Sequence, residues 1–226
     1  MCSNTNVVQN LAKSFLYGCL AIQDHVRVAV ENGQVVGCIM GKIETNPTTL
    51  TNRRYQLLLK WKNLVLSLRK ESKEAMQFNQ QITDLNKALL HETGQKFDGE
   101  LVLFIVDKSA RGKGIGTLLL EDLFAYFADQ EIQNIYLFTD TSCNYRFYER
   151  HGFIKRGSKT LQSEMCEIPL EKTAFSINAA SSAQLYIYIK KVNEWNKSSA
   201  HSRCSLLAKI FSSENLCQPA GRVSGF

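Results

Sequence analysis

The segment 101–117 constrains the fold of this 226-residue chain more than any other part of it. It starts with an unbroken apolar run over 101–106, which predicts a buried strand. A polar turn follows, and glycines then stand at every second position over 112–116, with Arg111 and Lys113 beside them. The apolar residues after the loop predict a helix. This order predicts an anion site, because glycine lets backbone N–H groups turn toward a phosphate and the helix N-terminus adds partial positive charge.

Two better-known phosphate loops do not fit this segment. In a P-loop a serine or threonine follows the Gly-Lys pair and binds magnesium, whereas Gly114 stands at that place here. In a dinucleotide-binding loop the third glycine stands one residue after Gly116, where this chain has Thr117. Asp140, at the end of the next expected strand, imitates the acid that binds the ribose in such folds. A dinucleotide site and a glycine turn without a ligand therefore stay open as alternatives.

Two segments resemble the sequence motifs of one protein family. Residues 111–116 resemble the Arg/Gln-x-x-Gly-x-Gly/Ala signature of the GNAT superfamily, the acetyl-CoA-dependent N-acetyltransferases. Residues 144–153, Asn-Tyr-Arg-Phe-Tyr-Glu-Arg-His-Gly-Phe, resemble the later motif of this family, a short helix with Phe-Tyr-Glu that ends at Gly-Phe. The resemblance covers about residues 20–191. The chain departs from the family at Thr141, where an Asn often stands seven residues before the helix tyrosine.

The resemblance implies an α/β (α+β) fold, with a GNAT-like mixed, mostly antiparallel central sheet flanked by helices. The alternation over 25–43 around an Asn-Gly turn predicts a hairpin, and Gly37 and Gly41 indicate looser points in its second strand. One helical period begins with Tyr55, Leu58 and Leu59, and a second runs from Ala75 to Leu89. Together they predict a helical hairpin within 45–98, inserted between the third and fourth strands. The other expected elements are a helix over 5–22, a helix over 114–128, a strand over 135–139, a helix with Tyr148, and a late hairpin of 153–159 with 185–190.

Composition and charge restrict the domain organisation and the partners. We expect residues 1–192 to form the GNAT domain and 193–226 to be an appended tail, either disordered or swapped onto a partner.

The net charge of +6 suits a polyanion such as coenzyme A, whereas the interleaved aromatic and basic residues of a nucleic-acid motif are missing. The apolar runs are too short to span a bilayer, and no secretory leader opens the chain. The seven scattered cysteines and four dispersed histidines favour reduced thiols over a zinc site. We expect a cytoplasmic protein with no metal, nucleic-acid or membrane partner; a homodimer stays open.

The resemblance also implies which residues bind the acyl donor, acetyl-CoA. Backbone N–H groups of the glycine loop should hold its pyrophosphate, with the two cations at the rim. The end of the motif strand should pair with the pantetheine arm and polarise the thioester carbonyl through a backbone N–H. Asn144 lies one turn after the position of the family asparagine. The expected coenzyme-binding residues are Ile105, Val106, Arg111, Gly112, Lys113, Gly114, Ile115, Gly116, Thr117, Thr141 and Asn144.

The chemistry implied by the resemblance is transfer of an acetyl group to a primary amine, by direct attack in a ternary complex. Tyr148 matches the family tyrosine and is the expected general acid toward the coenzyme thiolate. Glu100 stands where several GNAT enzymes carry a general base, and Glu44 is its rival. The segment 45–98 helps to choose the amine, or is a lid or dimer surface. The alternatives to this acyltransferase are a non-catalytic acyl-CoA-binding or regulatory module of the same fold and a nucleotide-binding oxidoreductase.

Overall fold

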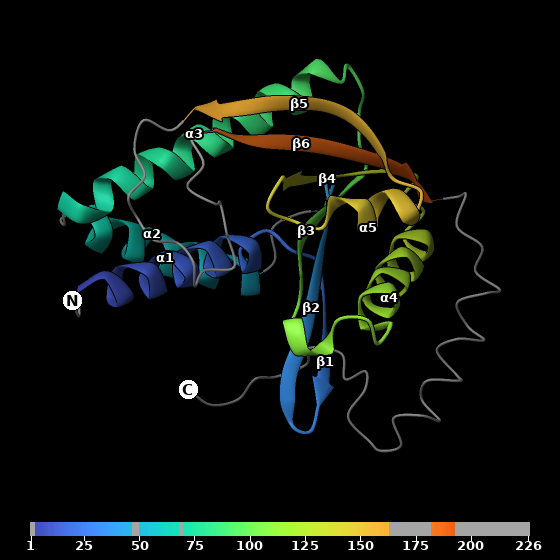
Figure 1. Ribbon diagram of the computed structural model, residues 1–226, viewed down its shortest axis with the longest axis horizontal. Helices are drawn as coiled ribbons and strands as arrows, with labels where there is room; N and C mark the ends of the chain where they lie inside the picture. Colours follow the sequence, from blue (N-terminus) through green and yellow to red (C-terminus); the bar gives the residue numbers. More distant parts are fainter. Residues whose placement is uncertain (1–2, 47–49, 68–69, 163–181, 193–226) are drawn as a thin grey trace. The chain divides into compact units, whose positions relative to one another are not determined.

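The structure of the chain, a computed structural model, describes residues 3–46, 50–67, 70–162 and 182–192. The strands of its six-stranded sheet follow the order β1-β2-β3-β4-β6-β5 (Figure 1). These strands are β1 (His25–Glu31), β2 (Gln34–Ile43), β3 (Gly99–Val106), β4 (Asn134–Asp140), β5 (Ile154–Gln162) and β6 (Ser182–Lys191). The helices are α1 (Ser3–Leu20), α2 (Leu50–Ser67), α3 (Lys70–Glu92), α4 (Ile115–Asp129) and α5 (Tyr145–Arg150), with a 3₁₀ turn η1 (Lys108–Ala110). The expected mixed, mostly antiparallel sheet flanked by helices is confirmed.

The expected helices and hairpins lie within a few residues of their predicted bounds, but the place of the helical hairpin was counted wrongly. It consists of α2 and α3 and lies between β2 and β3, the second and third strands of the described chain rather than the third and fourth. The reason is that α1 alone precedes β1 among the described residues. That this hairpin is an insertion in the family fold stays a prediction. The expected tail, 193–226, lies outside the described residues.

The chain folds as two compact units. The loop unit consists of β1, β2, β3, η1 and α4. The helical unit consists of α1, α2, α3, α5, β5 and most of β4 and β6. Among the residues that the structure describes, no helix combines the length and the apolar character that crossing a bilayer requires.

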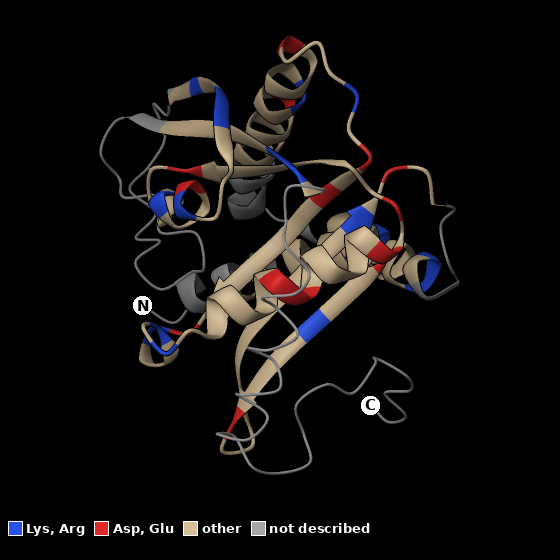
Figure 2. Ribbon diagram, turned by 90° about the vertical axis from the view of Figure 1, so that its right-hand side faces the viewer, with Lys and Arg blue, Asp and Glu red and all other residues tan. Residues whose placement is uncertain are grey.

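In the loop unit, α4 packs along the layer formed by β1, β2 and β3 (Figure 2). Strands β1 and β2 are antiparallel and are joined at Asn32 and Gly33, which both have positive φ, as the tight turn of a two-residue hairpin requires. A Cβ at Gly41 would collide with Leu123 and would lie 2.9 Å from Cζ of Phe127. Gly41 is therefore not a looser point of the strand, as the sequence indicated, but the place where α4 comes closest to the sheet.

In the helical unit, α1 packs against α2, α2 against α3, and α3 against β5 (Figure 1). Leu89 of α3 is fully buried, and a Cβ at Gly157 of β5 would lie 3.1 Å from its Cδ2. Strands β5 and β6 form the expected late antiparallel hairpin. The contact between α1 and α2 includes a hydrogen bond from the Ser14 hydroxyl to Oδ1 of Asn63 at 3.0 Å and the stacked rings of Tyr17 and Tyr55. The fold thus places glycines on its strands wherever a helix packs closest.

Candidate active site

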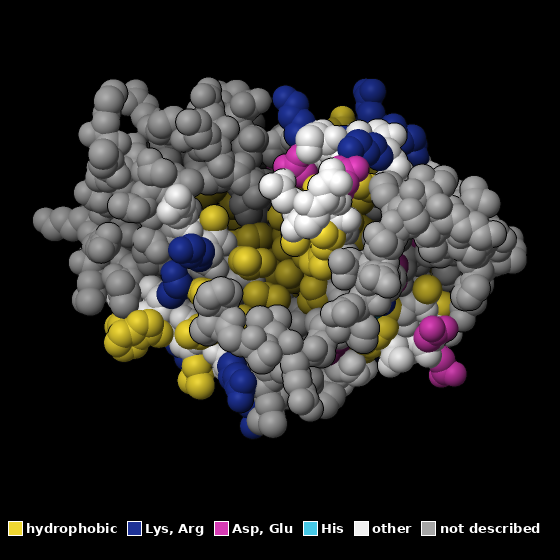
Figure 3. Space-filling view, turned by 90° about the horizontal axis from the view of Figure 1, so that it is seen from below, with side chains coloured by type: hydrophobic (Ala, Val, Ile, Leu, Met, Phe, Trp, Pro, Cys, Tyr) yellow, Lys and Arg dark blue, Asp and Glu magenta, His cyan; other side chains and the backbone are white. Residues whose placement is uncertain are grey.

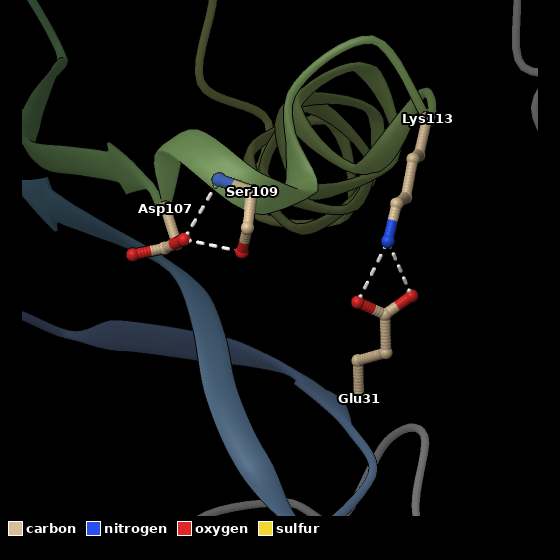
Figure 4. A network of polar contacts seen from close by, with 4 residues as sticks. All are labelled: Glu31, Asp107, Ser109 and Lys113. Carbon is tan, nitrogen blue, oxygen red and sulfur yellow. Dashed lines mark hydrogen bonds and ion pairs between the residues drawn. The ribbon is translucent and has the colours of Figure 1, made fainter.

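The glycine loop begins with a short turn that is tied to the sheet. Oδ1 of Asp107 accepts hydrogen bonds from the backbone N–H of Ser109 at 2.8 Å and from its hydroxyl at 2.5 Å (Figure 4). The N–H of Asp107 donates to the carbonyl of Val36 on β2 at 2.8 Å. The two hydrogen bonds from Ser109 lower the pKa of Asp107, and the positive charge of Arg111 lowers it further. These bonds fix the backbone from which the loop departs.

Two of the three loop glycines have a conformation that favours glycine. The φ angles of Gly112 and Gly114 are 79° and 81°, which cost an L-residue free energy, and a Cβ at either would meet no atom within 4 Å. Glycine is therefore needed there for the backbone conformation and not for space. Gly116, in contrast, lies inside α4 and is not among the residues with positive φ. The expectation that all three glycines turn the loop is wrong for Gly116.

The loop presents a row of backbone donors. The N–H groups of residues 112–116 donate to no acceptor within the described part of the chain. Gly114 is the N-cap of α4, so no side chain accepts a hydrogen bond from the first N–H groups of this helix at the capping position. The first N–H groups of a helix have no partner inside the helix, so they suit an anion together with the helix dipole. This geometry agrees with the expected pyrophosphate site.

The two loop cations are already engaged. Nζ of Lys113 lies 2.9 Å from both carboxylate oxygens of Glu31, at the turn between β1 and β2 (Figure 4). Nε of Arg111 donates to the carbonyl of Val106 at 3.2 Å. An exposed ion pair is worth only about 0–1 kcal/mol, so a bound polyanion can compete for Lys113. The sequence analysis did not identify Glu31 as the partner of Lys113, because no residue near Glu31 in the sequence indicates a contact with the glycine loop.

Strand β3 contains an irregularity in its first half. Leu101 pairs with Gly41 and Leu103 with Met40, so Val102 is left without a partner in β2 and forms a bulge. Ile105, near the end of the strand, is exposed, and Val106 is half-buried. Their expected contact with the pantetheine arm stays a prediction.

The two candidate bases flank one lysine on neighbouring strands. Glu100 on β3 pairs with Lys42 on β2, and the Lys42 ammonium lies 2.6 Å from Oε2 of Glu44. The carboxylate of Glu44 is therefore paired with the Lys42 ammonium. The choice between Glu100 and Glu44 as the base stays a prediction.

Tyr148 is held by the way in which α5 ends. Gly152 has a φ of 80°, its N–H donates to the carbonyl of Glu149, and the N–H of Phe153 donates to the carbonyl of Tyr148, both at 3.0 Å. A glycine in the left-handed region after the last turn is a common helix end. The ring of Tyr148 meets the rings of Phe147 and Phe153 edge to face, with centroids 5.8 and 5.7 Å apart. The Gly-Phe of the second motif thus fixes the tyrosine.

Burial in this aromatic cluster raises the pKa of the Tyr148 hydroxyl, and the negative charges of Cys143 and Asp140 raise it further. The hydroxyl therefore keeps its proton over the whole neutral range, as a general acid must. The same shift makes it a weaker proton donor than an ordinary tyrosine.

The glutamate of the second motif has a structural partner that the sequence reasoning missed. The hydroxyl of Tyr188, a fully buried residue of β6, donates to Oε1 of Glu149 at 2.8 Å. Burial raises the pKa of Tyr188, and the hydrogen bond to Glu149 adds to the shift. The carboxylate fastens α5 to β6, and the only sequence signal for this bond is the Glu that follows Tyr148.

The residues before α5 are placed as follows. The N–H of Thr141 donates to the carbonyl of Gln184 at 3.1 Å, and its side chain is exposed. Asn144 is the exposed N-cap of α5 and makes no capping hydrogen bond with its side chain. Asp140 is buried, and its carboxylate accepts from both the N–H and the hydroxyl of Ser142. Because Asp140 closes a turn, it does not support the dinucleotide alternative.

A family model decides which fold family these features belong to. Residues 80–153 match the acetyltransferase (GNAT) family. They include β3, the glycine loop, α4, β4 and α5 with Tyr148. This segment belongs to the GNAT superfamily. The resemblance expected from the two motifs is confirmed, and the match supports acetyl transfer, with acetyl-CoA as the acyl donor of the GNAT family.

Solved structures give a more distant likeness. An Ard1 protein from Thermoplasma volcanium is 16% identical, with 73% of this chain and 68% of that chain covered and a TM-score of 0.38. A GNAT family acetyltransferase from Elizabethkingia anophelis with acetyl-CoA bound is 12% identical, with 79% and 82% covered and a TM-score of 0.44. A GNAT family acetyltransferase from Streptococcus pneumoniae is 17% identical, with 73% and 64% covered and a TM-score of 0.38. The chain thus spans less than two thirds of that last protein. None of the curated proteins matches the chain.

The TM-scores below 0.5 add nothing about the roles of single residues in this chain. Within the described ranges, no three His, Cys, Asp or Glu side chains gather as ligands of a metal ion. The predicted site residues divide between the two units. Glu100, the end of β3 and the glycine loop belong to the loop unit, and Thr141, Asn144 and Tyr148 belong to the helical unit.

Proposed function

We propose that this protein is an N-acetyltransferase that moves the acetyl group of acetyl-CoA to a primary amine, by direct attack in a ternary complex. The observation that carries the proposal is a row of N–H groups over 112–116, at the start of α4 and inside the segment that matches the GNAT family. These groups have no acceptor among the residues that the structure describes. Such a row suits the diphosphate of coenzyme A.

The proposed reaction needs one base and one acid from the chain. The neutral amine attacks the thioester carbonyl, whose oxygen is polarised by a backbone N–H near Val106. The carbon–sulfur bond breaks, and the nitrogen loses a proton to Glu100, directly or through water. The thiolate takes a proton from Tyr148, and the phenolate is reprotonated from solvent. An alkylammonium has a pKa of about 10, so removal of the amine proton is required near neutral pH.

The raised pKa of Tyr148 sets the pH behaviour of this acid. A general acid works in its protonated form, so activity that depends on Tyr148 is lost only as the pH rises through its pKa. Because that pKa lies above the ordinary tyrosine value of about 10, kcat should show no alkaline fall from this group below about pH 10. We expect Tyr148→Phe to lower kcat about 100-fold with little change in acetyl-CoA affinity. Tyr126→Phe is the matched control for loss of a tyrosine hydroxyl; its ring stacks on His25.

The decisive experiment measures release of the coenzyme thiol from acetyl-CoA with a panel of small-molecule and peptide amines. Turnover on an amine supports the proposal. Binding of acetyl-CoA without turnover on any amine would favour the regulatory module, and binding of NAD without acetyl-CoA would favour the oxidoreductase. Comparing the pH–rate profiles of Glu100→Gln and Glu44→Gln then identifies the base.

A pair of glycine variants tests the loop itself. Gly114 and Gly33 have φ angles of 81° and 75°, and a Cβ at either would meet no atom within 4 Å. Alanine at either position should therefore cost a similar 1–2 kcal/mol of stability. Only Gly114→Ala should also raise the KM for acetyl-CoA, by about ten-fold or more. An equal KM in both variants would contradict the diphosphate site.

A further inference from the structure

Helix α2 exposes an apolar side to solvent. Leu57 and Trp61 stand four residues apart on one side of the helix, and 67% of the surface of each is exposed. Leu58 and Leu64, on the same side, are also exposed. Figure 3 shows that hydrophobic side chains are exposed at the surface of the described residues. We call Leu57, Leu58, Trp61 and Leu64 the α2 apolar face.

The inner side of the same helix carries several polar side chains beside Tyr55, whose ring stacks on Tyr17. Asn52 is buried, with 4% of its surface exposed. Asn63 accepts the hydroxyl of Ser14, and Nε2 of Gln56 donates to the carbonyl of Ala21 at 3.4 Å. A surface helix of a globular protein normally has the reverse arrangement, with its apolar stripe toward the core. Polar side chains thus take part in attaching α2 to α1, while Leu57 and Trp61 on its other side are mostly exposed.

The rim of this face carries only positive charge. Arg53 and Arg54 precede Leu57 by about one turn, Lys60 precedes Leu64 by one turn, and all three are exposed. Neither α1 nor α2 contains an Asp or Glu. An apolar centre with tryptophan and leucine, flanked by Arg and Lys, is the pattern of a helix that lies in a membrane interface.

We propose that the α2 apolar face docks on an anionic phospholipid surface. Charge complementarity favours this occupant over a second copy and over residues 193–226. A second copy would bring Arg53, Arg54 and Lys60 against identical cations, with no acid on α2 to offset them. The segment 193–226 contains more Lys and Arg than Asp and Glu, so it is repelled as well. Residues 163–181, with three Glu and one Lys, are the remaining rival, and a face that they cover would not bind anionic vesicles. Such docking needs no helix that spans the bilayer, and it departs from the sequence-based expectation of no membrane partner.

Sedimentation of the full chain with vesicles tests the proposal. Vesicles of one part phosphatidylserine to two parts phosphatidylcholine should bind the protein, and vesicles of phosphatidylcholine alone should bind it weakly. Trp61→Glu should lower the partition coefficient at least about ten-fold. Arg53→Gln and Arg54→Gln should each lower it about five-fold, and added salt should reduce this difference.

A matched variant controls for the added charge. Val35 on β2 in the loop unit is 64% exposed, close to the value for Trp61, so Val35→Glu makes the same change outside the α2 apolar face. It should bind the vesicles like the parent chain, and both glutamate variants should keep the parent affinity for acetyl-CoA. Because the chain has two tryptophans, Trp195→Phe leaves Trp61 as the only emitter, and its emission should shift to shorter wavelength on anionic vesicles.

Three results would overturn the proposal. The first is no sedimentation with anionic vesicles. The second is equal sedimentation of the parent chain and Trp61→Glu. The third is a dimer in lipid-free solution that Trp61→Glu converts to a monomer, since the face would then belong to a second copy. None of these readouts depends on acetyl transfer, so failure of this proposal and failure of the proposed function can be told apart.

Discussion

Helices α4 and α2 have similar lengths, 15 and 18 residues, yet they bury opposite kinds of side chain. The inner side of α4 is apolar, and its Leu123 and Phe127 lie on the glycines of β2 and β3. The inner side of α2 carries several polar side chains, and its outer side carries Leu57 and Trp61. The surface against which a helix packs therefore decides which of its sides is buried.

The energies that hold the two helices differ accordingly. Burial of a large apolar side chain contributes about 1.5–3 kcal/mol, and α4 buries several. A hydrogen bond contributes about 0.5–1.5 kcal/mol net, so the polar contact of α2 with α1 is weaker for each side chain. We expect α4 to be fixed firmly in the loop unit and α2 to be the more easily released helix.

The largest expected difference comes from one substitution made on both helices. Leu123→Ala removes a fully buried side chain of α4 and should lower the free energy of unfolding by about 2–5 kcal/mol. Leu57→Ala removes a side chain that is mostly in water and should change it by no more than about 0.5 kcal/mol. Urea unfolding followed by circular dichroism measures both. A loss above 2 kcal/mol for Leu57→Ala would show that its side chain is buried in solution.

A second pair of variants compares close packing with open space. A Cβ at Gly41 would collide with Leu123, so Gly41→Ala should destabilise the protein by about 1–3 kcal/mol. Gly18 lies in α1, and a Cβ there would meet no atom within 4 Å. Gly18→Ala should therefore stabilise the protein by about 0.5–1 kcal/mol, because it lowers the entropy of the unfolded chain. Thermal melts should move in opposite directions, and a shift of the same sign in both would refute the packing argument.

The sequence predicted the features that depend on local backbone conformation. The Asn-Gly turn of the first hairpin, the glycine loop before α4 and the Gly-Phe end of α5 all need positive φ at a glycine or asparagine. Because this requirement is met within a few residues, a sequence pattern can reveal it. For the same reason, both motifs of the candidate site could be found before the structure was known.

The features that depend on distant partners could not be predicted in this way. The helical period that began at Tyr55, Leu58 and Leu59 located α2, but Leu58 is exposed and Asn52 is buried. The pairing of Glu149 with Tyr188 joins residues 39 positions apart. Nothing in the local sequence encodes such contacts, because they depend on which surface each element meets after folding.

A third prediction concerns the charged contact between α4 and β1. Asp122 Oδ2 lies 2.8 Å from Nε2 of His25 and 2.9 Å from Nε of Arg27. Burial alone would raise the pKa of Asp122, but these hydrogen bonds and charges outweigh it and lower the pKa. A lowered pKa stabilises the fold above the unfolded value of about 3.9, and this contribution is lost as the pH falls through the folded value.

Asp122→Asn should therefore cost about 1–2 kcal/mol at pH 7 and should remove this part of the acid sensitivity below about pH 4. Unfolding curves of the parent and the variant, measured from pH 7 down to pH 3, should converge at the acid end. Curves that stay parallel over this range would show that the Asp122 contact does not stabilise the fold through its charge. Asp129→Asn, at the C-terminal end of α4, is the control for loss of a carboxylate on this helix.

The smallest expected effect tests the polar attachment of α2. Asn63→Ala removes the acceptor of the Ser14 hydroxyl and should cost about 0.5–1.5 kcal/mol. Asn79→Ala, at an exposed position of α3, should be neutral or slightly stabilising, since alanine favours a helix. A double-mutant cycle with Ser14→Ala isolates the pair. A coupling energy near zero would mean that α2 is not held by this bond, and the contrast with α4 would then rest on the remaining polar contacts of Asn52 and Gln56.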